Sequence, residues 1–389
     1  MALFETSSPK PLAASAPTLA GETQARRVVW IDGLRGLAVL IVLLYHHWGF
    51  AGFHELRLGT LDLADFLEHG VHGVHIFFVI SGFCLAWPFS GPAGKSLAQL
   101  SLGPFLQHRF ARLAPPYYVV LFLSALPVFA AAYVKTGLIP VNLWWDLLAH
   151  SLFIHNLSVD YTTTFNMALW TLALQFQFYL LFPLLLLLRG RTGPLGLALL
   201  VGSAELLYRL AVWSLPSSDW QLNHALAYAP PGRLFEFASG MALAGLIRDE
   251  AFNLTSRRTG WWCLLFCLGT GGAAYLLSRH YGRLYPAVDL LWAVFVCATI
   301  LLGFLSGLWR RFLSNRFLTF CGVCSYSIFL VHHPIGTWLH HHFYFEDHIP
   351  LWLRLAVMLA YVPLMIAAGW VAFRLLESRP VPNSLREGK

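Results

Sequence analysis

Long apolar runs separated by short polar segments constrain this chain more than any other feature. Runs of roughly 17 to 25 residues recur from about residue 34 to about residue 375, and a helix needs about 20 apolar residues to cross a bilayer. Only 12% of the residues are charged, which is about half the fraction that is typical of soluble domains. The pattern predicts an all-α polytopic membrane protein.

We predict about ten membrane-spanning helices from the hydropathy of the chain. Their expected ranges are 34–53, 72–90, 117–134, 168–188, 193–213, 232–247, 260–278, 287–306, 318–339 and 351–375. We expect residues 28–380 to form one transmembrane domain, flanked by a disordered N-terminal tail at 1–27 and a short C-terminal tail at 381–389. A weaker run at 141–158 fits either an eleventh span or an interfacial helix, and Trp144 and Trp145 favour the interface.

The net charge of +7 by itself suggests a nucleic-acid partner. The basic residues, however, gather in alternate loops, as expected for loops that face the cytoplasm. The charge therefore predicts orientation in a lipid bilayer, with both termini cytoplasmic, and no nucleic-acid partner.

The stretch RGLAVLIVLLYHH places Arg35 and His46 eleven residues apart in the first apolar run. In a helix they share a face and lie roughly 16 Å apart along the axis. Arg35 suits either an interfacial anchor or a functional role. His46 is deeper in the run, and a neutral imidazole there suits a general base, with a structural histidine as the alternative.

The stretch GVHGVHIFFVISGF contains Ser81 and Gly82, small residues that permit close helix contact or a broken helix beside a cavity. No G-x-S-x-G motif accompanies Ser81, so we assign it packing or hydrogen bonding. His69, His72 and His75 are spaced three apart, as metal ligands can be. No acidic partner is visible beside them, so we interpret them as loop histidines and predict no metal.

Arg109 and Arg112 lie three residues apart, on one face of a helix, just before the third predicted span. Two guanidinium groups on one face suit a clamp for phosphates, although a positive-inside loop has the same pattern. Pro115 and Pro116 are expected to break or restart the helix after this clamp.

Other polar side chains inside the apolar runs indicate a polar interior. Glu205 and Arg209 have the i, i+4 spacing of an intramembrane ion pair. Further candidates for substrate contact or structural hydrogen bonding are Trp170, Thr171, Gln175, Tyr179, Arg233, Glu236, Ser325, Tyr326 and His332.

Six motifs in a fixed order give the chain a family resemblance. They are DGLRG with Arg35 followed by His46, then GVHIFFVISGF, RFARLAPPYY, WTLALQFQFY, RLFEFASGM and GVCSYSIFLVHHP. With them, roughly residues 28–380 resemble the membrane-bound acyltransferase 3 family. Members of that family transfer acyl groups to sugars, cell-envelope glycans and some macrolide antibiotics.

The resemblance implies a catalytic His46, an essential Arg35, and a coenzyme A site at Arg109 and Arg112. Arg35 is expected to help hold the nucleotide phosphates. The implied donor is cytoplasmic acyl-CoA, with acetyl-CoA as the default, and the implied acceptor is a hydroxyl of a sugar, a glycan or a natural product. A coenzyme A thiolate leaves readily, so this reaction needs no metal. The implied location is the bacterial cytoplasmic membrane.

One position departs from the family pattern, which has Trp-Ser-Leu followed by a glutamate. Here Trp170-Thr171-Leu172 is followed by Gln175, whose neutral amide stabilises a charged partner less well than a carboxylate. Glu236 is a candidate substitute for the missing carboxylate. Two alternatives stay open: a transporter or flippase, and a catalytically impaired member that binds acyl-CoA. Acceptor identity, acyl length and oligomeric state are not predicted.

Overall fold

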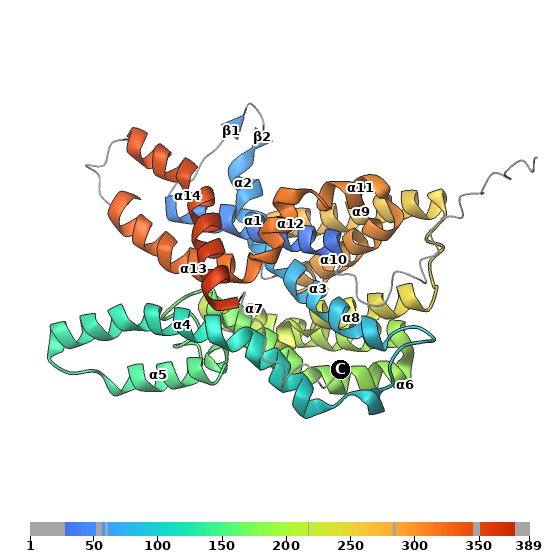
Figure 1. Cartoon of the computed structure of the whole chain (residues 1–389), viewed down its shortest axis with the longest axis horizontal. Coiled ribbons are helices and arrows are strands. Elements are labelled where there is room, and N and C mark those ends of the chain that lie inside the picture. Colours follow the sequence, from blue (N-terminus) through green and yellow to red (C-terminus); the bar gives the residue numbers. More distant parts are fainter. Residues whose placement is uncertain are drawn as a thin grey trace, which may run out of the picture.

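The structure is a computed structural model that describes residues 28–51, 57–58, 61–216, 218–282, 285–344 and 351–377. The predicted tails at 1–27 and 381–389 lie outside the described residues. What is described is helical (Figure 1), apart from one antiparallel hairpin of two-residue strands, β1 (Arg57–Leu58) and β2 (Leu61–Asp62). The all-α prediction is confirmed.

The α-helices occur along the chain in the order in which Figure 1 labels them. Those of the first half are α1 (Val29–Ala51), α2 (Leu63–Glu68), α3 (Gly73–Ala86), α4 (Leu102–Thr136), α5 (Val141–Ser151) and α6 (Leu169–Trp213). Those of the second half are α7 (Asp219–Ala227), α8 (Leu234–Arg248), α9 (Arg257–Tyr281), α10 (Val288–Leu305), α11 (Gly307–Leu313), α12 (Arg316–Val323), α13 (Ser325–Leu339) and α14 (Leu351–Ala372). Short 3₁₀ turns are η1 (His69–His72), η2 (Trp87–Phe89), η3 (Leu97–Gln99), η4 (His155–Leu157) and η5 (Pro230–Gly232), and η6 (His340–Tyr344) and η7 (Phe373–Glu377) are π-helical.

Seven stretches of the described chain are long and apolar enough to cross a bilayer. They are Val29–Phe50, Ala64–Phe89, Leu102–Thr136, Leu169–Trp213, Arg257–Tyr281, Val288–Leu305 and Leu359–Glu377. The pair α12–α13, bent by 73°, adds an eighth if it is one broken span. A multi-pass membrane protein is therefore supported. The count of ten and the sides of the termini stay predictions.

Part of the difference in count lies in α6, which has 45 residues. Its backbone leaves the helical region at Gly193 (φ 76°, ψ 172°), a conformation that only glycine adopts readily. The two predicted spans 168–188 and 193–213 both lie in α6, one on each side of this kink. Another part lies in α8, whose 15 residues are shorter than a typical span.

Helix α4 runs unbroken through Pro115 and Pro116, so the predicted break after the arginine pair is wrong. Proline is tolerated inside membrane helices where neighbouring groups supply hydrogen bonds to the backbone. The Tyr326 hydroxyl of α13 donates to the carbonyl of Leu113, 2.6 Å away, and so holds the turn of α4 just before the prolines against a neighbouring helix, although the carbonyls that the prolines leave without an N–H donor are those of Ala111 and Arg112. Arg109 and Arg112 therefore lie within the 35-residue helix rather than before it.

Helix α5 settles the ambiguous run at 141–158 by its length. Its 11 residues rise about 16 Å, against a hydrocarbon thickness of about 30 Å. Trp144 and Trp145 are more than half exposed, as expected at an interface. In Figure 1, α4 and α5 project together beyond the other helices. The interfacial interpretation is favoured over an eleventh span.

Helix α1 lies at the centre of the fold and packs against α3, α11, α12, α13 and α14. Its most extensive contact is with α12, where a Cβ added to Gly36 would overlap the carbonyl oxygen of Leu318, and one added to Gly322 would overlap that of Asp32. Small residues permit such close packing in membranes, where no hydrophobic effect drives helices together. This contact fixes the N-terminal half of α1, which carries Arg35.

Helix α3 is held in the same way against α8. A Cβ on Gly82 would overlap the carbonyl oxygen of Phe237, and a Cβ on Gly240 would overlap that of Val79. The close contact predicted for the Ser81-Gly82 segment is confirmed. With one side of α3 fixed on α8, other side chains of the helix, including Ser81 and Cys84, line a cavity.

Candidate active site

A cavity of about 230 Å³ lies between α1, α3, α4, α6, the α12–α13 junction and η7. Most of the side chains singled out in the sequence converge here, although they come from separate motifs. Its polar and ionisable lining consists of Arg35, Ser81, Cys84, Arg109, Arg112, Thr171, Gln175, Tyr179, Ser325, Tyr326 and Glu377.

Arg35 reaches the cavity from the N-terminal half of α1. Its Nη1 donates to Asp32 Oδ1, 3.2 Å away, and its Nη2 lies 3.8 Å from Cys84 Sγ. The Asp32 carboxylate, one turn earlier in the helix, neutralises part of the charge and fixes the guanidinium beside the cavity.

Arg109 and Arg112 enter the cavity from α4 and differ from Arg35 in their partners. Neither makes an ion pair with a carboxylate in the described part of the chain. Arg109 lies over the rings of Phe105 and Tyr179, 5.6 and 6.0 Å from their centroids, and its buried Nε has no hydrogen-bond partner among the described residues. A guanidinium held by aromatic rings, with donors left unused, is suited to binding an anion.

Gln175 and Ser81 meet across the cavity. The Gln175 Nε2 donates to Ser81 Oγ, 2.8 Å away, which leaves the amide oxygen free to accept another hydrogen bond. Thr171, one turn earlier in α6, donates its hydroxyl to the carbonyl of Ala168 at 2.8 Å. Of this pair of α6 side chains, the Gln175 amide oxygen is therefore the group available to a ligand.

Three further predicted residues line the cavity, and two of them bind the surrounding backbone. Tyr326 holds the Leu113 carbonyl, and Ser325 donates to the Gly322 carbonyl at 2.8 Å. Tyr179 forms one of the two aromatic faces under Arg109. These contacts give Ser325 and Tyr326 a structural role in joining α12, α13 and α4.

His46 lies on α1 with Arg35, as predicted, but it does not line the cavity. Its ring packs against His332 and His333 of α13, with centroids 4.9 and 5.9 Å apart, and we call these three residues the histidine group. Phe329 lines the cavity and also contacts His332, with centroids 5.2 Å apart. The histidine group therefore lies behind Phe329.

His332 is fully buried, and its geometry fixes its tautomer. Its Nδ1 lies 2.6 Å from the carbonyl oxygen of Phe329, so Nδ1 carries the proton and donates it. Its Nε2 is then an acceptor, buried and without a partner among the described residues. The Tyr361 hydroxyl donates to the backbone carbonyl of His332 and fixes this turn of α13.

Arg233 and Glu236 belong to a second, separate polar site. We call it the ion-pair cluster, and it consists of His75, Glu205, Arg209, Arg233, Glu236 and Asp289. Arg209 pairs with Glu205 at 3.2 Å, which confirms that predicted ion pair. Glu236 accepts from Arg233 at 3.0 Å and lies 2.9 Å from His75 Nδ1.

Glu236 is thus committed to the ion-pair cluster and does not line the cavity, so it does not replace the carboxylate missing at Gln175. Trp170 also lies outside the cavity lining, with its ring 5.8 Å from the Arg233 guanidinium carbon and in edge contact with Tyr228.

The interpretation of His72 and His75 as loop histidines is wrong. Both are buried, His72 in η1 and His75 in α3, and both lie near carboxylates. The acidic partners Glu236 and Asp289 come from α8 and α10, more than 150 residues away in sequence, so no local pattern reveals them. The available signal was an acidic residue at the start of an apolar run, Asp289, which we did not single out.

Comparisons with known proteins agree with the motifs. Residues 28–374 match the family model of an acyltransferase domain. The acyltransferase MdmB of Streptomyces mycarofaciens is 26% identical over 79% of this chain and 78% of its own length. The peptidoglycan O-acetyltransferase OatA of Listeria monocytogenes is 28% identical over 79% of this chain, and the O-acetyltransferase OatA of Staphylococcus aureus is 26% identical over 90% of it.

The chain spans about half of the length of these two OatA proteins, 49% and 56% respectively. No solved structure matches the chain. Because the family model covers nearly all of the described residues, the resemblance seen in the motifs is confirmed, and the chain belongs to this family of acyltransferase enzymes.

Proposed function

We propose that this protein moves an acyl group, acetyl by default, from cytoplasmic acyl-CoA to a hydroxyl of a sugar, glycan or natural-product acceptor. The observation that carries the proposal is the cavity in which Arg35, Arg109 and Arg112 converge. Coenzyme A carries a diphosphate and a further phosphate, and planar guanidinium groups are the side chains best suited to phosphate oxygens.

In this proposal Arg109 and Arg112 bind the phosphates, and Arg35 of α1 completes the phosphate site. The two α4 arginines make no direct ion pair with a carboxylate in the described chain, and Glu377 is the one carboxylate in the lining of the cavity, so their donors are available to a phosphate. Arg35 is already paired with Asp32 and contributes less charge. The acyl-pantetheine arm then extends along α1 toward His46, roughly 16 Å from Arg35.

His46 is the proposed general base. The acceptor hydroxyl oxygen attacks the thioester carbonyl carbon, its proton passes to the His46 imidazole, and the C–S bond breaks. The coenzyme A thiolate leaves and takes up a proton. Because Phe329 lies between the cavity and the histidine group, the thioester must pass this ring, or the ring must move, before the reacting atoms meet.

Gln175 stands at the position of the family glutamate, so its effect on activity is the main alternative within this proposal. Its amide donates to Ser81 and retains one acceptor oxygen. If catalysis needs a full negative charge there, the protein binds acyl-CoA without efficient turnover. This impaired form is the second candidate, and Gln175 is the observation that favours it.

The proposed setting is the bacterial cytoplasmic membrane, with about ten spans and both termini on the cytoplasmic side. This orientation places the donor site at the cytoplasm, where acyl-CoA is made. The Listeria relative is named for O-acetylation of peptidoglycan, which supports a glycan acceptor for the present chain.

Inverted membrane vesicles, radiolabelled acetyl-CoA and an extract of host envelope glycans test the proposal. We expect labelled glycan with the parent protein, none with His46→Ala, and full transfer with the control His280→Ala, an exposed histidine on α9. Transfer only with Gln175→Glu identifies the impaired form. Equal transfer by the parent and His46→Ala contradicts the role of His46, and no transfer by any variant across several acyl donors contradicts the proposed reaction.

A further inference from the structure

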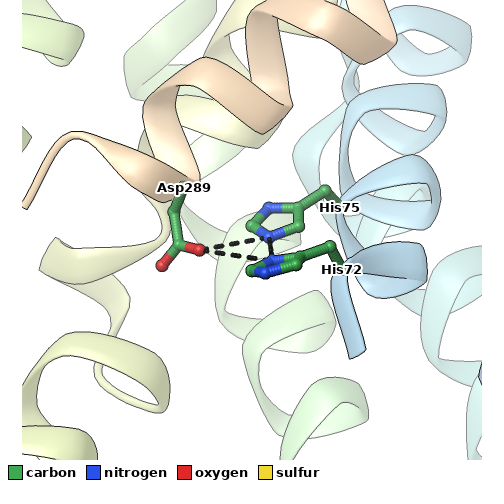
Figure 2. Close-up of side chains that lie close together, drawn as sticks. All are labelled: His72, His75 and Asp289. Carbon is green, nitrogen blue, oxygen red and sulfur yellow. Dashed lines mark hydrogen bonds and ion pairs between the residues drawn. The ribbon is translucent and has the colours of Figure 1, made fainter. Parts of the chain in front are cut away.

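Three ligand atoms of buried side chains converge at the edge of the ion-pair cluster, two of them from its members His75 and Asp289 and the third from His72 (Figure 2). His72 Nδ1 lies 3.2 Å from His75 Nε2, and Asp289 Oδ1 lies 3.2 Å from His75 Nε2 and 3.8 Å from His72 Nδ1. The three residues come from η1, α3 and α10, so the convergence is a product of the fold.

These distances match the edges of a tetrahedral metal site. A triangle with sides of 3.2, 3.2 and 3.8 Å has a circumscribed radius of about 2.0 Å, so one point lies at that distance from all three atoms. Zinc bonds to histidine nitrogen and carboxylate oxygen are about 2.0–2.2 Å long. An ion near the plane of the three atoms therefore needs little movement of the ligands.

The remaining polar atoms of the three residues are held as those of metal ligands usually are. His75 Nδ1 lies 2.9 Å from Glu236 Oε1, and His72 Nε2 lies 3.3 Å from Ser278 Oγ. Asp289 Oδ2 is bound by Arg209 and Arg233. Partners of this kind orient metal ligands and fix the histidine tautomers.

These partners leave a lone pair on each of the three converging atoms. If His75 donates from Nδ1 to Glu236 and His72 donates from Nε2 to Ser278, both facing nitrogens are acceptors. They face each other and a carboxylate oxygen, an arrangement that is repulsive without a positive centre between them. Arg233 Nη1 lies 3.4 Å from His75 Nε2 and satisfies that atom only weakly.

The net charge of the ion-pair cluster also favours a bound cation. Two arginines, Arg209 and Arg233, face three carboxylates, Glu205, Glu236 and Asp289, in the ion-pair cluster. With neutral histidines the cluster carries one uncompensated negative charge, which is costly in a buried site. A proton on one of the histidines or on one of the carboxylates also removes that charge, and the experiments below separate this case from a bound ion.

We propose that His72, His75 and Asp289 bind one divalent first-row transition-metal ion, with Zn²⁺ as the expected occupant. Two histidines and one carboxylate form a ligand set that suits this class of ion. The site does not line the cavity, so the ion has a structural role: it joins the N-terminal end of α3 to that of α10. This proposal replaces the sequence-based expectation of no metal, and it does not depend on the acyl-transfer reaction.

The first test is the metal content of the full-length protein, purified in detergent through an affinity tag without histidines, supplied with Zn²⁺ and then freed of loosely bound ions. We expect about one Zn²⁺ per chain, by mass spectrometry of the metal. His72→Ala and Asp289→Asn should each lose it. His69→Ala is the matched control, because His69 belongs to the same histidine row but contacts Asp65 and lies outside the three ligands; it should retain the ion.

Adventitious binding at the surface needs a separate control, because His341 and His342 are neighbouring histidines in η6. Replacing both with asparagine should leave the metal content unchanged. A wild-type content below about a tenth of an equivalent overturns the proposal, as does equal loss in His69→Ala and His72→Ala, or loss of the ion in the His341→Asn/His342→Asn variant.

A second measurement does not need the ligand variants to fold. Wild-type protein loaded with Co²⁺ should show the visible d–d absorption of a tetrahedral nitrogen and oxygen site, and Zn²⁺ should displace it. Chelator should lower the Tm of the wild type, because ligands that bind the folded state stabilise it. No absorption and a Tm that chelator leaves unchanged would mean that a proton on a histidine or a carboxylate of the cluster balances the charge, and the metal proposal would be wrong.

Discussion

The arginine pair of α4 permits a test of donor binding that needs no knowledge of the acceptor. We consider Arg109→Met and Arg112→Met, each of which removes the guanidinium and keeps an unbranched apolar side chain. Neither arginine lies within ion-pair distance of a carboxylate in the described chain, although Glu377 lines the same cavity, so each substitution breaks no direct ion pair. Each variant should therefore fold, and each should weaken the binding of the phosphate groups.

The expected magnitude follows from the contacts that are lost. A hydrogen bond to a charged group contributes about 1.5–3 kcal/mol, and about 1.4 kcal/mol corresponds to a tenfold change in affinity. Each variant should therefore weaken acetyl-CoA binding by about 10- to 150-fold. Arg109 should lie toward the upper end, because its stacking on Phe105 and Tyr179 restricts the guanidinium before the ligand arrives.

The assay is the Kd of acetyl-CoA for purified protein in lipid nanodiscs. Arg311→Met, on the exposed face of α11, is the matched control, since it removes the same group away from the cavity and should leave the Kd unchanged. S-acetylpantetheine, which lacks phosphates, is the matched ligand. It should bind the wild type more weakly than acetyl-CoA does, and its Kd should be the same for the wild type and for all variants.

Two results would refute the reasoning. If Arg109→Met and Arg112→Met change the Kd of acetyl-CoA by less than about twofold, the cavity arginines do not hold the phosphates. If they weaken S-acetylpantetheine as much as acetyl-CoA, the variants have altered the cavity as a whole, and the phosphate clamp is wrong.

Three further variants test the packing around the site. Arg209→Met leaves the buried Glu205 without its arginine and leaves Asp289 with Arg233 alone, and should cost about 3–5 kcal/mol, seen as a lower Tm in detergent. An unchanged Tm would mean that the pair is not buried as described. Gly82→Leu places a side chain against a backbone carbonyl of α8 and should abolish the yield of monodisperse protein. Gly272→Ala, whose added methyl group meets open space, should leave the yield unchanged. Equal yields of the two variants would contradict the α3–α8 contact. Ser81→Ala removes the acceptor of the Gln175 amide and should lower stability by about 1 kcal/mol, measured from the same unfolding curves, and no loss would show that the contact is dispensable.

Much of the helical framework was predictable, because a bilayer sets the length and composition of each span. The errors arise where the backbone preference of a residue type was used without the neighbouring helices that can override it. Pro115 and Pro116 predict a break in an isolated helix, but α4 passes through them beside the Tyr326 hydroxyl of another helix. Gly193, by contrast, marks a real kink at the boundary expected between two spans.

The lining of the cavity was also largely predictable, and for a physical reason. Polar side chains inside apolar runs are costly unless they meet one another or a cavity. Arg35, Ser81, Arg109 and Gln175 come from four separate runs, and they meet at one cavity. What the sequence could not give is which polar residues belong to which site. Glu236 is a candidate from the sequence to substitute for the carboxylate missing at Gln175, yet it binds His75 and Arg233 on the side of α3 that faces α8.

The position of His46 shows the same limit at the level of a single helix. Eleven residues are close to three full turns, so Arg35 and His46 do share a face of α1, as the spacing predicts. Helical periodicity, however, says nothing about what packs on that face. The structure places α12 against the N-terminal half of α1 and α13 beside His46, with Phe329 between the histidine group and the cavity. If His46 is the base, a thioester held in the cavity must therefore pass Phe329, or this ring must move, before the acyl group reaches the imidazole.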